Sequence, residues 1–184
     1  MTEAYIIDAV RTPRSIGKMG KGALSTMHPE HLSATVLAAL KERNNLNTAD
    51  VDDVIWGVSG AIGLQGGDIG RNAALDAGYD GKAGGVTMNR FCGSSITTTN
   101  FGAAMIMSGM HDLVVAGGMD MLSYVNYFGQ KMREAGLSGG GMGAGNPRLQ
   151  AKHPQSNQGI CADAIAAMEG ITRAELEQLG VESQ

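Results

Sequence analysis

The chain has 184 residues, which is enough for one substantial core with an appendage and too few for several full domains. A composition of 43% hydrophobic and 17% charged residues is typical of a globular, soluble protein, and the net charge of −4 argues against nucleic acid or an anionic membrane as a partner. The 28 glycines are about twice the usual ~7% and follow no collagen-type period, so they predict tight turns and close backbone approaches.

The first 120 residues alternate between short β-rich runs and helical patterns. Strands are predicted at residues 5–10, 54–58, 86–89 and 113–116, the last of them fully buried. A loop follows the first strand at 12–22, and helices are predicted at 28–43, 69–77 and 94–107. This alternation predicts an α/β fold, a parallel or mixed sheet covered by helices.

After Gly118 the pattern changes. Residues 138–145 (SGGGMGAG) have no periodicity and are interpreted as a loop that leads into a separate subdomain. Helices are predicted at 161–168 and after Thr172, where Thr172 and Glu175 have the spacing of a capping box. The last helical pattern continues to Gln184 with no terminating signal, so the chain looks cut inside a helix.

The cysteines and histidines limit the cofactor chemistry. Cys92 and Cys161 are far apart and lack the CxxC spacing, so neither a disulfide framework nor a zinc site is expected. His28 and His31 share a helix face without a third ligand, so we expect no metal site. With no signal-peptide pattern and no apolar stretch near the ~20 residues of a membrane span, a cytoplasmic protein is expected.

The most informative segment is NRFCGSSITTT at 89–99, where a cysteine stands between a predicted strand and a glycine that opens a helix. The free N–H groups and the positive end of a helix favour a thiolate. From the residues alone, Cys92 is either a nucleophile or a small buried hydrophobe. Gly57, Gly60 and Gly63 have a spacing that suits a dinucleotide, but we interpret them as turn glycines.

Three segments together resemble the thiolases, acyl-CoA acyltransferases of the acetyl-CoA acetyltransferase type. These segments are DAVRTPRSIGKMGKGALS at 8–25, NRFCGSS at 89–95 and VVAGGMDMLS at 114–123, and a fainter likeness runs from Gly159 onward. The resemblance implies a fold of two similar mixed α/β halves with a loop domain inserted in the first. Residues 1–120 would then be the core of the first half and residues 121–184 the start of the loop domain, with the C-terminal half absent from this chain.

The resemblance also implies a reaction. The Cys92 thiolate would attack an acyl-CoA thioester, and the acyl group would pass to a second acyl-CoA in a Claisen condensation or to CoA in thiolysis. CoA thioesters would be the substrates, with no other cofactor, and the protein would be a homodimer or homotetramer. The alternatives are another condensing enzyme of the same superfamily, or a non-catalytic thiolase-like subunit that binds a partner or an acyl-CoA.

Two further catalytic groups of the family, a histidine and a second cysteine, lie in its C-terminal half. None of the four histidines of this chain matches the family's catalytic histidine, and Cys161, which we interpret as a small core residue, does not match the second catalytic cysteine. We therefore expect activity to need the remaining half or an equivalent subunit. Alignment on Gly159 places Gln158 where the family often has the methionine of a His-Met-Gly motif near the acyl and pantetheine pocket. Gln158 would make that pocket more polar; the alternative is an ordinary loop residue.

Overall fold

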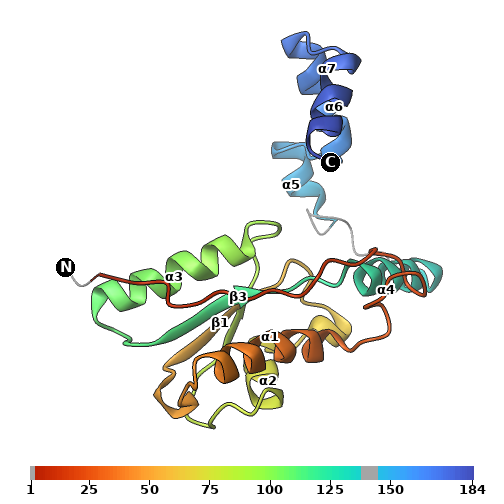
Figure 1. Ribbon diagram of the computed structural model, residues 1–184. Coiled ribbons are helices and arrows are strands. Elements are labelled where there is room, and N and C mark those ends of the chain that lie inside the picture. Colours follow the sequence, from red (N-terminus) through yellow and green to blue (C-terminus); the bar gives the residue numbers. More distant parts are fainter. Residues whose placement is uncertain (1–2, 138–144) are drawn as a thin grey trace. The chain divides into compact units, whose positions relative to one another are not determined.

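The computed structural model describes residues 3–137 and 145–184 and divides the chain into two compact units, 1–135 and 136–184 (Figure 1). The first unit is a small sheet covered by helices, which confirms the predicted α/β architecture. Most of the predicted glycine-rich loop, residues 138–144, lies outside the described residues.

In the described residues the sheet has three strands in the order β2-β1-β3. The central strand β1 (Asp53–Gly57) pairs in parallel with β2 (Val86–Met88) and with β3 (Val114–Gly118). All three lie at predicted positions, and their pairing is parallel rather than mixed. The prediction that the last strand is fully buried is wrong, because β3 is an edge strand here and only its Val115 is buried.

Helices cover both faces of this sheet (Figure 1). Helix α2 (Ile69–Asp76) packs on β1 and β2, and α1 (Pro29–Arg43) packs on α2. Helix α3 (Ser94–Ser108) lies against β1 and β3 on the opposite face. The bounds of these helices agree with the prediction to within a residue at each end.

The alternation of side chains along β1 divides the core between the two faces. Val54 and Trp56 belong to the hydrophobic cluster with α1 and α2, and the indole Nε1–H of Trp56 donates to Ser33 Oγ at 3.0 Å. Gly57 faces the start of α3 instead. The sheet is therefore sealed on the α1 and α2 side by large side chains, and on the α3 side partly by glycine.

Local signals explain where the helices begin. The Nδ1 atom of His28 accepts a hydrogen bond from the N–H of Glu30 at the start of α1, whose first residue is proline. Asp68 caps α2 in the same way through Arg71 N–H. Two short 3-10 helices, η1 (Thr48–Asp50) and η2 (Gly63–Gln65), join these elements.

The strand predicted at 5–10 is absent from the structure. The segment has no paired strand, and Tyr5, Ile6 and Ile7 are more than 70% exposed. A β-rich sequence becomes a strand only where a neighbouring strand supplies hydrogen-bond partners, and this segment pairs with no described strand. Asp8 ties it to the end of α1, where its carboxylate accepts a hydrogen bond from Asn44 and pairs with Arg43.

Helix α4 (Leu122–Glu134) was not predicted, and it belongs to the first compact unit. Its Tyr124 is buried, and the Tyr124 hydroxyl accepts a hydrogen bond from Leu64 N–H at 2.8 Å. The predicted loop domain begins at residue 121, so the contacts of α4 connect the first residues of that segment to the core unit. The domain boundary itself stays a prediction.

The second unit contains α5 (Pro147–Lys152), α6 (Gln158–Glu169) and α7 (Arg173–Glu182). The predicted capping box of Thr172 and Glu175 is present, whereas α6 begins three residues before the predicted helix. None of the unit's described residues is buried. No helix in the described part of the chain has the length and apolar character needed to span a membrane.

Candidate active site

Cys92 lies in the short connection between β2 and α3, immediately before Gly93, the N-cap residue of α3. Its side chain is exposed, so the alternative of a small buried hydrophobe is wrong for the chain as described. Among the residues that the structure describes, no hydrogen-bond acceptor is found for the main-chain N–H of Cys92. The connection therefore presents an exposed thiol close to the positive end of a helix.

The residue before Cys92 has an unusual backbone conformation. Phe91 has a φ of +48°, in the left-handed region that residues with a side chain rarely adopt. The Phe91 N–H donates to Asn89 Oδ1 at 2.7 Å. The Phe91 carbonyl oxygen accepts hydrogen bonds from both the N–H and the hydroxyl of Ser94. These bonds close a tight turn that places Cys92 at its outer side.

The start of α3 rests on main chain rather than on side chains of the sheet. A Cβ atom at Gly57 would lie 2.7 Å from the carbonyl carbon of Ser94, and one at Gly118 would lie 2.3 Å from Ser95 Oγ. Gly57 and Gly118 are partners in the register of β1 and β3, so they form one flat spot at the carboxyl end of the sheet. Gly57, interpreted from the sequence as a turn residue, instead serves a close approach that brings the helix end to this edge.

A set of hydrogen-bonded polar residues in the segments after the three strands was not identified from the sequence. Asn89 Nδ2 donates to the carbonyl oxygen of Ser59 at 3.1 Å, and the N–H of Ser59 donates to both carboxylate oxygens of Asp120, at 3.1 and 3.2 Å. Gln65 is fully buried beside them, and its Oε1 accepts the N–H of Met121 at 2.6 Å. Asn89 and Asp120 lie in two of the three motifs that resemble thiolases. Their place in these motifs was the signal in the sequence that could have identified them.

Titratable groups with shifted pKa values lie elsewhere in the first unit. The main-chain N–H groups of Leu113 and Asp112 hydrogen-bond to the Asp52 carboxylate and hold its pKa below the usual value, at the opposite end of β1 and β3. Burial raises the pKa of Tyr79 to about 12. These groups stabilise the scaffold and do not border the Cys92 connection.

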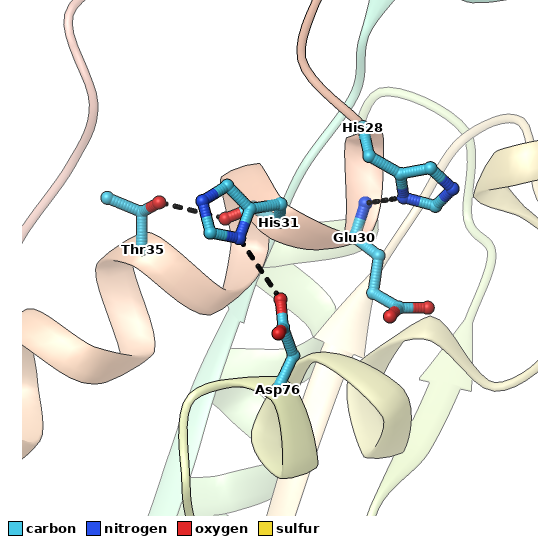
Figure 2. Close-up of polar contacts among 5 residues, drawn as sticks. All are labelled: His28, Glu30, His31, Thr35 and Asp76. Atoms are coloured by element: carbon cyan, nitrogen blue, oxygen red, sulfur yellow. Dashed lines mark hydrogen bonds and ion pairs between the residues drawn. The ribbon is translucent and has the colours of Figure 1, made fainter.

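Two of the histidines have structural roles (Figure 2). His28 caps α1, while the ring of His31 turns the other way, with Nδ1 3.2 Å from Asp76 Oδ2 on α2. The described residues contain no group of three or more His, Cys, Asp or Glu side chains arranged to hold a metal ion.

Gln158 and Cys161 lie in the second unit, on α6. Gln158 is the first residue of that helix and is exposed, and Asn157 before it caps the helix by accepting Gly159 N–H at 2.9 Å. The role of Gln158 in substrate binding stays a prediction. The interpretation of Cys161 as a core residue is wrong: its side chain is exposed, since the described residues of this unit bury nothing.

Comparison with known proteins gives the family. Residues 4–184 match the model of the thiolase N-terminal domain, and the chain belongs to the thiolase family. A steroid 3-ketoacyl-CoA thiolase of Mycobacterium tuberculosis is 40% identical over 190 residues, which cover 100% of this chain and 45% of that protein.

Two other similar relatives are a β-ketoadipyl-CoA thiolase of Acinetobacter baylyi and a 3-ketoacyl-CoA thiolase of Psychrobacter cryohalolentis. The first is 35% identical over 195 residues, covering 100% of this chain and 47% of the relative. The second is 34% identical over 183 residues, covering 98% of this chain and 43% of the relative. The chain thus spans about half the length of the curated relatives that it matches.

Proposed function

We propose that this chain is the nucleophile-bearing part of a thiolase, with Cys92 as the residue that carries the acyl group. The observation that carries the proposal is the exposed thiol at the start of α3, in a chain whose family membership covers residues 4–184. A cysteine thiol is an intrinsically strong nucleophile, and an exposed one is accessible for thioester exchange. The substrates are CoA thioesters, and no other cofactor is part of the proposal.

The proposed reaction has two steps. For condensation, Cys92 Sγ attacks the carbonyl carbon of an acyl-CoA; the carbon–sulfur bond to CoA breaks, and CoA leaves as a thiol with the proton of Cys92. The acyl group then moves from Sγ to the α-carbon of a second acyl-CoA, which loses a proton as Cys92 returns to the thiol. For thiolysis, Sγ attacks the 3-keto carbon of a 3-ketoacyl-CoA, the bond between C2 and C3 breaks with protonation of C2, and the acyl group then moves from Sγ to the sulfur of CoA, whose proton returns to Cys92. The N–H of Cys92, which has no acceptor among the described residues, is available to stabilise the negative oxygen of the tetrahedral intermediate.

The proposal includes a further polypeptide portion, which corresponds to the rest of the length of the relatives and is supplied in the same chain or as a subunit. Two observations support this portion: the difference in length from the relatives, and the exposed apolar side chains of α3. Exposed apolar side chains that gather on one element mark a surface that another polypeptide covers. Three apolar side chains of α3 and one that follows it closely are at least 40% exposed: Ile96, Phe101, Met107 and Met110.

This face also has an open, largely apolar depression of about 320 Å³, lined by Phe101, Ala104, Met105, Ser108 and Met110. We propose that the further portion covers it and supplies the histidine and second cysteine that the family uses. A cytoplasmic location and assembly as a homodimer or homotetramer, the latter supported by the family resemblance, complete the proposal.

The test is acyl transfer to the full chain. Incubation with acetyl-CoA, followed by peptide mass spectrometry, is expected to place an acetyl group on Cys92. The variant Cys92→Ser is expected to lose the adduct, because an alcohol has no accessible anion at neutral pH. Cys161→Ala is the matched control and is expected to be acetylated as the wild type. An adduct on Cys161 with Cys92 unmodified would contradict the assignment, and acyl-CoA binding without any adduct would favour a non-catalytic subunit.

A further inference from the structure

The connection that carries Cys92 is tied to the rest of the unit by one side-chain amide. Asn89 follows β2, and it uses both ends of its amide: Oδ1 accepts the Phe91 N–H at 2.7 Å, and Nδ2 donates to Ser59 O at 3.1 Å. The first bond lies inside the turn and the second leaves it. Asn89 therefore couples the turn to the segment that follows β1.

Ser59 is itself held from its other side. Its N–H donates to both oxygens of Asp120, which follows β3, so the segments after all three strands are joined in one chain of hydrogen bonds. Gln65 supports the same segments: its Nε2 donates to Gly60 O at 3.0 Å and its Oε1 accepts Met121 N–H. The anchor to which Asn89 binds is thus fixed by buried amide contacts.

The turn needs such an anchor because of Phe91. A residue with a side chain keeps a φ of +48° only where its surroundings hold it there. Phe91 is 53% exposed, so packing of its side chain contributes little. The hydrogen bonds of the turn hold this conformation, and Asn89, which accepts the Phe91 N–H, also bonds through Nδ2 to Ser59 outside the turn.

We propose that Asn89 is a positioning residue for Cys92: through Ser59 and Asp120 it holds Phe91 in the left-handed conformation that sets the thiol at the start of α3. The proposal rests on the proposed acyl transfer for its consequence in catalysis, and on geometry alone for the conformation of the turn.

The experiment uses these 184 residues with Cys161→Ala, together with the further polypeptide portion, so that Cys92 is the single cysteine of this part of the protein. Two rates are measured on the Cys92 peptide by mass spectrometry: acetylation by acetyl-CoA and alkylation by iodoacetamide. Asn89→Ala is expected to lower both rates by about tenfold, as the left-handed turn loses population. Asn89→Asp keeps the acceptor for Phe91 N–H and loses the donor to Ser59, so an intermediate decrease is expected. Asn100→Ala, an exposed asparagine on α3, is the matched control and is expected to react as the background protein.

A rescue separates positioning from a general loss of structure. Glycine adopts positive φ without strain, so Phe91→Gly added to Asn89→Ala is expected to restore both rates to within about threefold. Thermal melting of each variant reports whether it folds. If Asn89→Ala melts early, the rates of Asn89→Asp decide whether Asn89 positions Cys92. Wild-type rates in both Asn89 variants, or a folded Ala variant that Phe91→Gly does not rescue, would overturn the proposal. If the background protein forms no acetyl adduct, the proposed function fails, and the alkylation series still decides on Asn89.

Discussion

Replacement of Gly57 by alanine tests the contact between the sheet and the start of α3. The new Cβ atom would lie 2.7 Å from the carbonyl carbon of Ser94 and 2.8 Å from the N atom of Ser95. Ordinary carbon contacts need about 3.5 Å, so the start of the helix must retreat by about 0.8 Å. Because the obstacle is main chain, no side-chain rotation relieves it.

Overpacking of this kind costs about 1–3 kcal/mol, and we expect Gly57→Ala to lower the free energy of unfolding by about 2 kcal/mol in urea denaturation. The retreat also moves the Cys92 connection, and a misplacement near 1 Å lowers rates by about a hundredfold, so acetylation of Cys92 by acetyl-CoA should fall by that order. Gly81→Ala is the matched control, since a Cβ there meets nothing within 4 Å. A Gly57→Ala protein with wild-type stability and wild-type acetylation would refute the close approach.

Three further predictions concern the scaffold. Burial raises the pKa of Tyr79 to about 12, whereas the tyrosine of the unfolded chain has a pKa of ~10. Between these two pH values Tyr79 ionises only in the unfolded chain, so the free energy of unfolding falls as pH rises. Tyr79→Phe should therefore flatten this part of a plot of the urea midpoint against pH. The hydrogen bond from Asn44, together with the Ala9 N–H and Arg43, lowers the pKa of Asp8 in the folded chain. The Asp8 carboxylate therefore stabilises the fold above the unfolded pKa of ~3.9, and this stabilisation is lost as pH falls through the lower pKa of the folded chain. Asp8→Asn should therefore be less stable than the wild type at pH 7 and equal to it at pH 2, and a persistent difference at pH 2 would contradict this cause. Thr172→Ala removes the capping hydroxyl of α7 and should lower helicity in circular dichroism, whereas Thr172→Ser should not.

Elements set by local signals were predictable from the sequence. The helix that begins at Pro29 follows from apolar periodicity and a proline in its first turn, the helix that begins at Ser94 is a run of small residues after a glycine, and the Thr172 capping box is a four-residue pattern. The strand predicted at 5–10 failed because strand formation depends on a partner far away in the chain. Helix α4 was not predicted: Leu122, Val125 and Phe128 recur at helical spacing, but the helix begins after Met121, which makes no side-chain cap hydrogen bond.

The site was predictable in part for the same reason. The place of Cys92 between a strand and a helix is local, and the structure has it there; its role as nucleophile, and that of Gln158 in substrate binding, stay predictions. The bonds from Asn89 to Ser59 and from Ser59 to Asp120 join residues 30 and 61 positions apart. No periodicity or spacing in the sequence indicates such pairs, since they arise only when the carboxyl ends of parallel strands meet at one edge.

The second unit has a consequence for the order in which the protein acquires structure. Its three helices are set by Asn146, Asn157 and Thr172 at their first turns, and the described residues bury no side chain among themselves. Short helices that rest on caps alone are marginal in water, because nucleation is costly and burial normally provides the rest. Their amides should exchange with solvent deuterium orders of magnitude faster than those of β1, whose strand is buried from Val54 to Gly57. The first unit can therefore fold before these helices become ordered and independently of them. The helices become stable when a surface buries exposed apolar side chains such as Ile165 and Leu179.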